Sequence, residues 1–211
     1  MKPEIDYTLY LVTDRNLMAA DKIEDCVEQA ILGGCTLVQL REKDAPFHEF
    51  YRTALRVREV TSRLGVPLII NDRADIALAV DADGLHIGQG DLPCEAARRI
   101  VGPDKIIGVS AGGLSEALEA AAMGADYLGV TIFSTGTKAD TTLTSMDELM
   151  RIRENVSIPI VVIGGINKAT LPLFKGTGID GIAVVSAIVS QKNPAQAARE
   201  LKIIFEDVRK K

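Results

Sequence analysis

The chain has 211 residues and a net charge of −5, with its Lys and Arg residues scattered along its length. It has no basic stripe of the kind a nucleic-acid surface shows and no 18-residue apolar stretch, so neither nucleic acid nor a membrane is an expected partner. Apolar residues make up 47%, aromatics only 4%, and Trp is absent, which predicts a core of Val, Ile, Leu and Ala in strands buried on both faces.

Short apolar, β-branched runs recur along the chain and predict eight strands. They span residues 9–13, 37–40, 68–71, 84–87, 106–110, 127–130, 160–163 and 181–185. Amphipathic helical patterns fill the spacers, and Ser115 is expected to cap the fifth helix. Eightfold strand–helix alternation without a linker predicts an α/β fold, a single (β/α)₈ TIM-barrel domain over residues 1–211. The rival architecture is an open doubly wound sheet, but this chain has no GxGxxG turn after its first predicted strand.

The N-terminal segment and the cysteines bear on location. The segment MKPEIDYTLYLVTD is too acidic, and its apolar run too short, for a signal peptide. Cys26, Cys35 and Cys94 lie far apart and form no CxxC pair, as expected of reduced core residues. We therefore expect a soluble, cytoplasmic protein; a homo-oligomer is left open.

Two carboxylates, Asp72 and Asp91, come directly after predicted strands 68–71 and 84–87. Active sites of (β/α)₈ barrels lie at the carboxyl ends of the strands, where these side chains would meet. Mg²⁺ is commonly held by one or two carboxylates while substrate phosphates and water complete its octahedron. The pair therefore predicts a Mg²⁺ site, against the alternative that each Asp only caps a turn or helix.

The QLREK segment places Gln39, Arg41 and Lys43 at alternate positions, so in extended chain they share one face. We expect them to point into the barrel mouth, where Arg and Lys bind phosphate. The alternative is a solvated strand end in which Glu42 and Asp44 are ion-pair partners.

Further phosphate-binding candidates follow the later strands. Gly164 and Gly165 let the backbone approach an anion closely, the segment NKATLPLF after them would offer amide N–H groups, and Ser186 adds a hydroxyl. The segment STGTK offers Thr135, Thr137 and Lys138 in a loop that could close over a pyrophosphate or be merely polar.

No protein nucleophile is recognisable. His86, in the fourth strand, is either a satisfied core residue or faces a ligand, and the chain has neither a GxSxG elbow nor a convincing reactive Cys or Lys. Metal-assisted group transfer is therefore favoured over covalent catalysis.

Several blocks together resemble thiamine-phosphate synthase. They are LYLVTD, GGCTLVQLREK, LIINDRADIALAVDADGLHIGQGDLP, STGTKAD, VVIGGI and GIAVVSAI, from about residue 9 to 188. The resemblance implies a transferase that joins hydroxymethylpyrimidine diphosphate to a thiazole phosphate, with Mg²⁺, releasing pyrophosphate.

The resemblance also implies roles for individual residues. Asp72 and Asp91 would hold Mg²⁺. The pyrimidine diphosphate would be bound by Gln39, Arg41, Lys43, Asn71 and Lys138, with Ser110 near its ring or diphosphate. Thr135 and Thr137 would contact the thiazole, and Gly165, Val185 and Ser186 its phosphate. Arg41, Lys43, Ser110 and Lys138 are the expected catalytic residues.

One segment departs from the family pattern, and two other functions remain as alternatives to the synthase. Thr131 stands where family members usually carry a Gly-Pro pair, the loop is one residue shorter, and Ser134 replaces a common Pro. A thiazole-tautomerase-like barrel would lack the metal carboxylates and the diphosphate-binding Arg and Lys. A non-catalytic thiamine-phosphate-binding protein would tolerate the altered loop.

Overall fold

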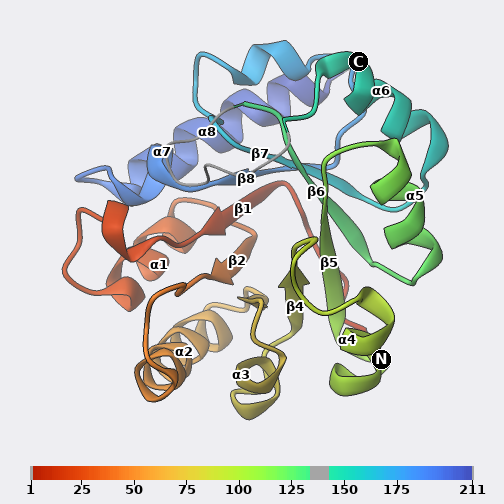
Figure 1. The fold of residues 1–211 in the computed structure, drawn as a ribbon. Coiled ribbons are helices and arrows are strands. Elements are labelled where there is room, and N and C mark those ends of the chain that lie inside the picture. The colour runs from red at the N-terminus through yellow and green to blue at the C-terminus, as the bar shows by residue number, and fades with distance from the viewer. Residues whose placement is uncertain (1, 134–142, 211) are drawn as a thin grey trace.

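A computed structural model describes residues 2–133 and 143–210, and its strands form a closed parallel barrel in the order β1 to β8 (Figure 1). The strands are β1 (Leu9–Val12), β2 (Leu37–Leu40), β3 (Leu68–Asn71), β4 (Gly84–Ile87), β5 (Ile106–Ala111), β6 (Tyr127–Thr131), β7 (Ile160–Ile163) and β8 (Gly181–Val184). Pairing of β1 with β8 closes the barrel. The predicted (β/α)₈ fold is thus confirmed, and each of the eight strands lies within one residue of its expected bounds at either end.

Helices surround the barrel on the outside (Figure 1). They are α1 (Ile23–Leu32), α2 (Phe47–Arg63), α3 (Ala74–Ala79), α4 (Cys94–Val101), α5 (Leu114–Ala122), α6 (Met146–Asn155), α7 (Ser186–Val189) and α8 (Pro194–Arg209), with 3₁₀ helices η1 (Arg15–Leu17) and η2 (Leu171–Phe174). After β7 the connection is therefore a 3₁₀ turn rather than a full α-helix. None of the helices in the described part of the chain is long and apolar enough to cross a membrane.

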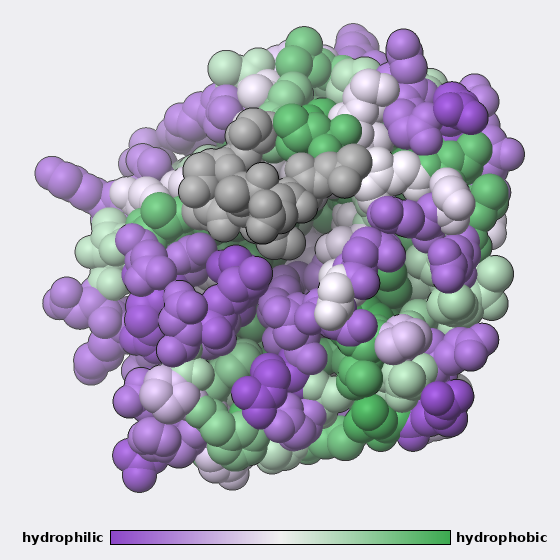
Figure 2. Space-filling model, in the orientation of Figure 1, coloured by the Kyte–Doolittle hydropathy of each residue, from purple (hydrophilic) through white to green (hydrophobic). Residues whose placement is uncertain are grey.

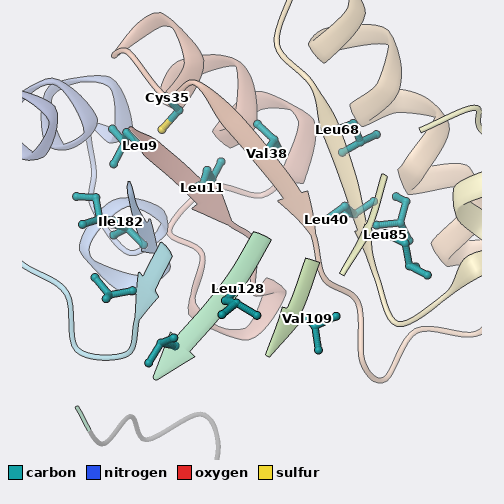
Figure 3. Packing of buried hydrophobic residues seen from close by; sticks show 14 of the residues in the cluster. Leu9, Leu11, Cys35, Val38, Leu40, Leu68, Leu85, Val109, Leu128 and Ile182 are labelled. Atoms are coloured by element: carbon teal, nitrogen blue, oxygen red, sulfur yellow. The ribbon is translucent and has the colours of Figure 1, made fainter. Parts of the chain in front are cut away.

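Alternation along the strands separates two hydrophobic layers. Leu9 and Leu11 belong to the larger layer, between strands and helices, whereas Tyr10 and Val12 belong to a smaller cluster inside the barrel. Figure 3 shows the aliphatic side chains of the larger layer directed from the strands toward the helices. Because neighbouring residues of a strand point to opposite faces, the inward positions remain available for polar groups near the strand ends.

Among the α-helices of the described residues, α6 and α8 begin with a side-chain cap. The Ser145 side chain accepts a hydrogen bond from the Glu148 backbone N–H at the start of α6. The expected cap at Ser115 is wrong, because α5 begins one residue earlier, at Leu114, with Gly113 as its N-cap. The Glu148 side chain instead accepts from the Leu114 backbone N–H at 2.8 Å, so a neighbouring helix satisfies this terminus.

Candidate active site

A cavity of about 460 Å³ opens at the carboxyl ends of the strands and is lined by residues from all eight of them or the segments that directly follow. The binding residues predicted from the sequence that line it are Gln39, Arg41, Asn71, Ser110, Gly164, Gly165, Val185 and Ser186. Hydrophilic residues predominate across the middle of the face shown in Figure 2. Lys43, Asp72 and Asp91 are not part of the cavity wall, and Thr135, Thr137 and Lys138 lie outside the described residues.

The QLREK segment does not form the continuous inward ladder that its spacing predicted. Strand β2 ends at Leu40; Gln39 is 4% exposed and faces inward, and Arg41 lines the cavity. Lys43 lies in a bend beyond the strand and is exposed. The alternation holds only while the backbone remains extended, which explains why the third member leaves the common face.

Arg41 is held in place by the end of β1. Its Nη1 donates to Asp14 Oδ2 at 3.0 Å, and its backbone N–H donates to Thr13 Oγ1, also at 3.0 Å. The Asp14 carboxylate also accepts from the Asn16 backbone N–H. Both side chains of the ion pair are largely buried, so the guanidinium is oriented before any ligand arrives. Sequence reasoning missed this role of Asp14, although the Thr-Asp pair after the first strand was its signal.

Asp72 and Asp91 follow the paired strands β3 and β4. Asp72 has a φ of 62°, in the left-handed region, and its backbone N–H donates to the His86 carbonyl at 2.8 Å. Such a conformation costs on the order of 1–3 kcal/mol for a residue other than glycine and is often found at functional sites. Asp91 is exposed, and its Oδ2 accepts from the Gly88 backbone N–H at 2.7 Å.

The carboxylates at the ends of β3 and β4 are oxygen donors, the kind of ligand that a hard cation takes. Within residues 2–133 and 143–210 no group of three or more His, Cys, Asp or Glu could by itself hold a metal ion. Two carboxylates with phosphate oxygens and water are what Mg²⁺ commonly takes, whereas a site built wholly from protein would need more donors.

Gly164 and Gly165 form a tight turn after β7. Their φ values are 93° and 61°, and a Cβ on Gly164 would lie 2.6 Å from the Phe133 carbonyl oxygen. The turn therefore needs glycine for both its conformation and its close contact with the chain after β6. The amides that follow are already used, because Asn167 Oδ1 accepts from the N–H groups of Ala169 and Thr170. The expectation that NKATLPLF offers free amides to an anion is therefore wrong at these two positions.

A buried polar network crosses the barrel beneath the cavity. Gln39 Nε2 donates to Tyr10 Oη at 2.8 Å, which lies 2.8 Å from Tyr127 Oη. Tyr127 Oη lies 2.9 Å from His86 Nδ1, and His86 Nε2 lies 3.0 Å from Ser110 Oγ. Burial is the main cause that raises the pKa of the Tyr10 and Tyr127 hydroxyls far above the ordinary tyrosine range, so both stay protonated. The place of the two tyrosines in this network was not predicted from the sequence. The feature that could have indicated it is an aromatic residue in each of two otherwise aliphatic strands.

Thr131, the position of the departure from the family pattern, is the last residue of β6 and lines the cavity. Its carbonyl accepts from the Thr144 backbone N–H at 2.8 Å, and Thr144 Oγ1 donates to the Gly112 carbonyl at 3.1 Å. Thr131 and Thr144, which lie before and after the altered loop, are therefore joined to each other and, through Gly112, to the chain directly after β5.

A closed (β/α)₈ barrel with a cavity at the carboxyl ends of its strands, lined by both apolar and polar side chains, and with a glycine turn after β7, has the architecture of the barrel enzymes that bind substrates at this face. The family model described as thiamine monophosphate synthase matches residues 9–188. The chain therefore belongs to the thiamine monophosphate synthase family, and it is a transferase of thiamine biosynthesis.

Similar proteins agree with this membership over nearly the whole chain. A thiamine-phosphate synthase of Clostridium beijerinckii is 62% identical over 97% of this chain and 99% of its own. One from Clostridium botulinum is 59% identical over 98% and 97%, respectively. The solved thiamine phosphate pyrophosphorylase of Pyrococcus furiosus superimposes with a TM-score of 0.88 at 40% identity, covering 97% of this chain and 98% of that one.

Proposed function

We propose that the protein is a thiamine-phosphate synthase that couples 4-amino-2-methyl-5-hydroxymethylpyrimidine diphosphate with a thiazole phosphate (or its carboxylate), in the presence of Mg²⁺. The products are thiamine phosphate and pyrophosphate. The observation that supports this best is one rim that combines the Arg41–Asp14 pair, the two strand-end carboxylates and the glycine turn after β7. We expect these groups to bind two separate phosphorylated substrates on different sides of the cavity mouth.

The diphosphate would lie at the β2–β3 side of the cavity. Gln39, Arg41 and Asn71 would bind it there, with Lys43 and Lys138 as further cations. The prior orientation of Arg41 by Asp14 lowers the entropy lost on binding, and its planar donors match phosphate oxygens. Lys43, exposed beyond the strand, would reach the diphosphate as a mobile charge rather than as part of a fixed ladder.

Asp72 and Asp91 would hold Mg²⁺, which when bound supplies charge neutralisation for the diphosphate. The Gly88 N–H occupies one oxygen of Asp91, which orients the carboxylate. The backbone bond from Asp72 to the His86 carbonyl fixes the end of β3 against β4. The Asp91 carboxylate is thus oriented by neighbouring backbone, and the backbone of Asp72 is held against β4.

The thiazole phosphate would lie at the opposite side, against Gly165, Val185 and Ser186, with Thr135 and Thr137 near the ring. Anchoring a substrate by its phosphate aims its reactive atom, so the thiazole nitrogen would face the pyrimidine methylene carbon. The bond from that carbon to the diphosphate oxygen breaks first, leaving a pyrimidinylmethyl cation. The thiazole nitrogen lone pair then forms the new C–N bond, and pyrophosphate leaves with the electrons of the broken bond. Arg41, Lys43 and Lys138 would stabilise the charge on the leaving group.

The remaining features of the proposal concern the whole chain. Residues 1–211 would act as a single barrel domain in the cytoplasm, on small-molecule substrates, without nucleic-acid or membrane partners. The net charge of −5 and the scattered basic residues support this.

Pyrophosphate release tests the proposed function. The purified protein receives pyrimidine diphosphate, with thiazole phosphate and Mg²⁺ each added or withheld, and thiamine phosphate is measured in parallel. We expect release only when both substrates and Mg²⁺ are present, with one thiamine phosphate formed per pyrophosphate. Thiazole-phosphate binding without coupling would contradict the proposal and favour the tautomerase-like or binding-protein alternative.

A further inference from the structure

The buried network beneath the cavity has a direction that follows from its hydrogen count. A tyrosine hydroxyl has one proton to donate. Among the described residues, the partners of Tyr10 Oη are Gln39 Nε2 and Tyr127 Oη. Because the Gln39 amide nitrogen donates, Tyr10 must give its own proton to Tyr127.

The network continues from Tyr127 to His86 and Ser110 on the other side of the barrel. Tyr127 Oη accepts from Tyr10, so its proton goes to His86 Nδ1 at 2.9 Å. With Nδ1 accepting, the imidazole proton lies on Nε2 and is donated to Ser110 Oγ at 3.0 Å. Since the Ser110 oxygen then accepts from His86, its own proton is available to donate elsewhere.

The barrel is built to hold this chain of groups. Tyr10 and Tyr127 are at most 1% exposed, and His86 is 9% exposed. A Cβ on Gly108 would lie 2.4 Å from Tyr127 Oη, and one on Gly129 would lie 3.0 Å from His86 Cε1. Two glycines on β5 and β6 thus leave the space that the phenol and the imidazole occupy. Ser110 is further fixed by Gln89, whose Nε2 donates to its carbonyl at 2.6 Å.

We infer that Tyr10, Tyr127 and His86 are positioning residues that make the Ser110 hydroxyl a hydrogen-bond donor to the cavity, and so select a ligand that presents a lone pair there. This inference rests on the proposed function for the identity of the ligand. Of the two substrates, the aminopyrimidine carries ring nitrogens that accept a hydrogen bond, beside an amino group that donates. With the diphosphate at the β2–β3 side of the cavity, Ser110 on β5 faces the pyrimidine ring. There it recognises a ring nitrogen and disfavours the amino edge, which fixes how the ring is turned in the cavity.

The direction of the network is measurable without any substrate. The chain has two histidines, and His48 is exposed on α2, so a His48→Gln variant leaves His86 as the sole imidazole. Nitrogen-15 NMR of that protein distinguishes a protonated ring nitrogen from one that accepts. We expect the proton on Nε2 and an accepting Nδ1. A proton on Nδ1 would mean that the network runs from Ser110 toward Gln39, which would overturn the inference.

A double-mutant cycle tests the effect on substrate. Ser110→Ala removes one neutral hydrogen bond to the pyrimidine, so KM for the diphosphate should rise by roughly 3- to 10-fold. Tyr127→Phe removes the hydroxyl that fixes the imidazole proton on Nε2, so Ser110 is no longer held as a donor to the ligand, and KM should rise by a similar factor. The double variant should be no worse than Ser110→Ala alone, because both changes remove the same interaction.

Tyr51→Phe, on the outer helix α2, is the matched control and should leave KM unchanged. Tyr10→Phe provides a second break in the network and should raise KM less, because Tyr127 keeps its own proton for His86. If KM of the double variant rose by the product of the two single effects, Tyr127 would have a merely structural role. That result would overturn the inference. If the unmodified enzyme formed no thiamine phosphate, the proposed function would be overturned. The imidazole tautomer decides the direction of the network independently of that result.

Discussion

Gly108→Ala should strongly destabilise the protein, because position 108 has no room for a side chain. An added Cβ would lie 2.0 Å from Tyr127 Cζ and 2.3 Å from Cε1. Reaching the 3.4 Å of ordinary van der Waals contact would require a shift of about 1.4 Å. Tyr127 is fully buried and packed against Tyr7 and His86, at centroid distances of 5.0 and 5.5 Å, so a shift of its ring would disturb both contacts.

The expected loss is about 3 kcal/mol in the free energy of unfolding, the upper end of the usual overpacking range of roughly 1–3 kcal/mol. For a domain of about 200 residues this corresponds to a fall in Tm of roughly 6–12 °C. Urea denaturation followed by circular dichroism measures the change, with an unchanged m-value as the sign that the fold is kept. Coupling activity should also fall, because Tyr127 supports His86.

Two further variants make the Gly108 test specific. Gly90→Ala is the matched control, because its Cβ meets nothing within 4 Å and its φ is ordinary. This variant should leave the free energy of unfolding unchanged or raise it by up to about 1 kcal/mol, because alanine lowers the conformational entropy of the unfolded chain. In a Tyr127→Leu background, which removes the clashing ring atoms, Gly108→Ala should cost clearly less than in the unmodified chain. A loss below about 0.5 kcal/mol for Gly108→Ala alone would refute the packing argument.

Three other outcomes are expected. Asp72→Asn and Asp91→Asn should each lower turnover at limiting Mg²⁺ by at least about tenfold without unfolding the barrel, whereas exposed Asp75→Asn should not; activity near that of the unmodified enzyme would contradict the metal assignment. Ser186→Ala should raise KM for thiazole phosphate by roughly tenfold, as expected for one hydrogen bond to a charged group, with KM for the pyrimidine diphosphate as the internal control. Burial raises the pKa of Glu42, so the folded state binds its proton more tightly than the unfolded state does. Its contribution to the free energy of unfolding therefore falls as pH rises from about 4.3 through the raised pKa, and Glu42→Gln should remove that slope in urea titrations at several pH values.

The sequence by itself determined the barrel and much of its rim. Eight β-branched runs of four to six residues, separated by amphipathic patterns, leave few folds open, and parallel strands must then deliver their carboxyl ends to one side. Gln39, Arg41, Asn71 and Ser110 reach the cavity for that reason alone. Their placement depends on strand direction and on alternation along a strand, both of which are local properties that a sequence records.

Only the tertiary structure decided which groups meet across the barrel. Arg41 pairs with Asp14 from 27 positions away, and Tyr10 meets Tyr127 across 117 positions. Such contacts depend on the closure and register of the sheet, which no local pattern specifies. Lys43 left the predicted ladder because the chain bends after Leu40. The helix start at Ser115 was misplaced because a side chain of a neighbouring helix, and not a local cap, satisfies that terminus. Interactions within one element are encoded locally, whereas those between elements arise only once hydrophobic burial has brought distant parts of the chain together.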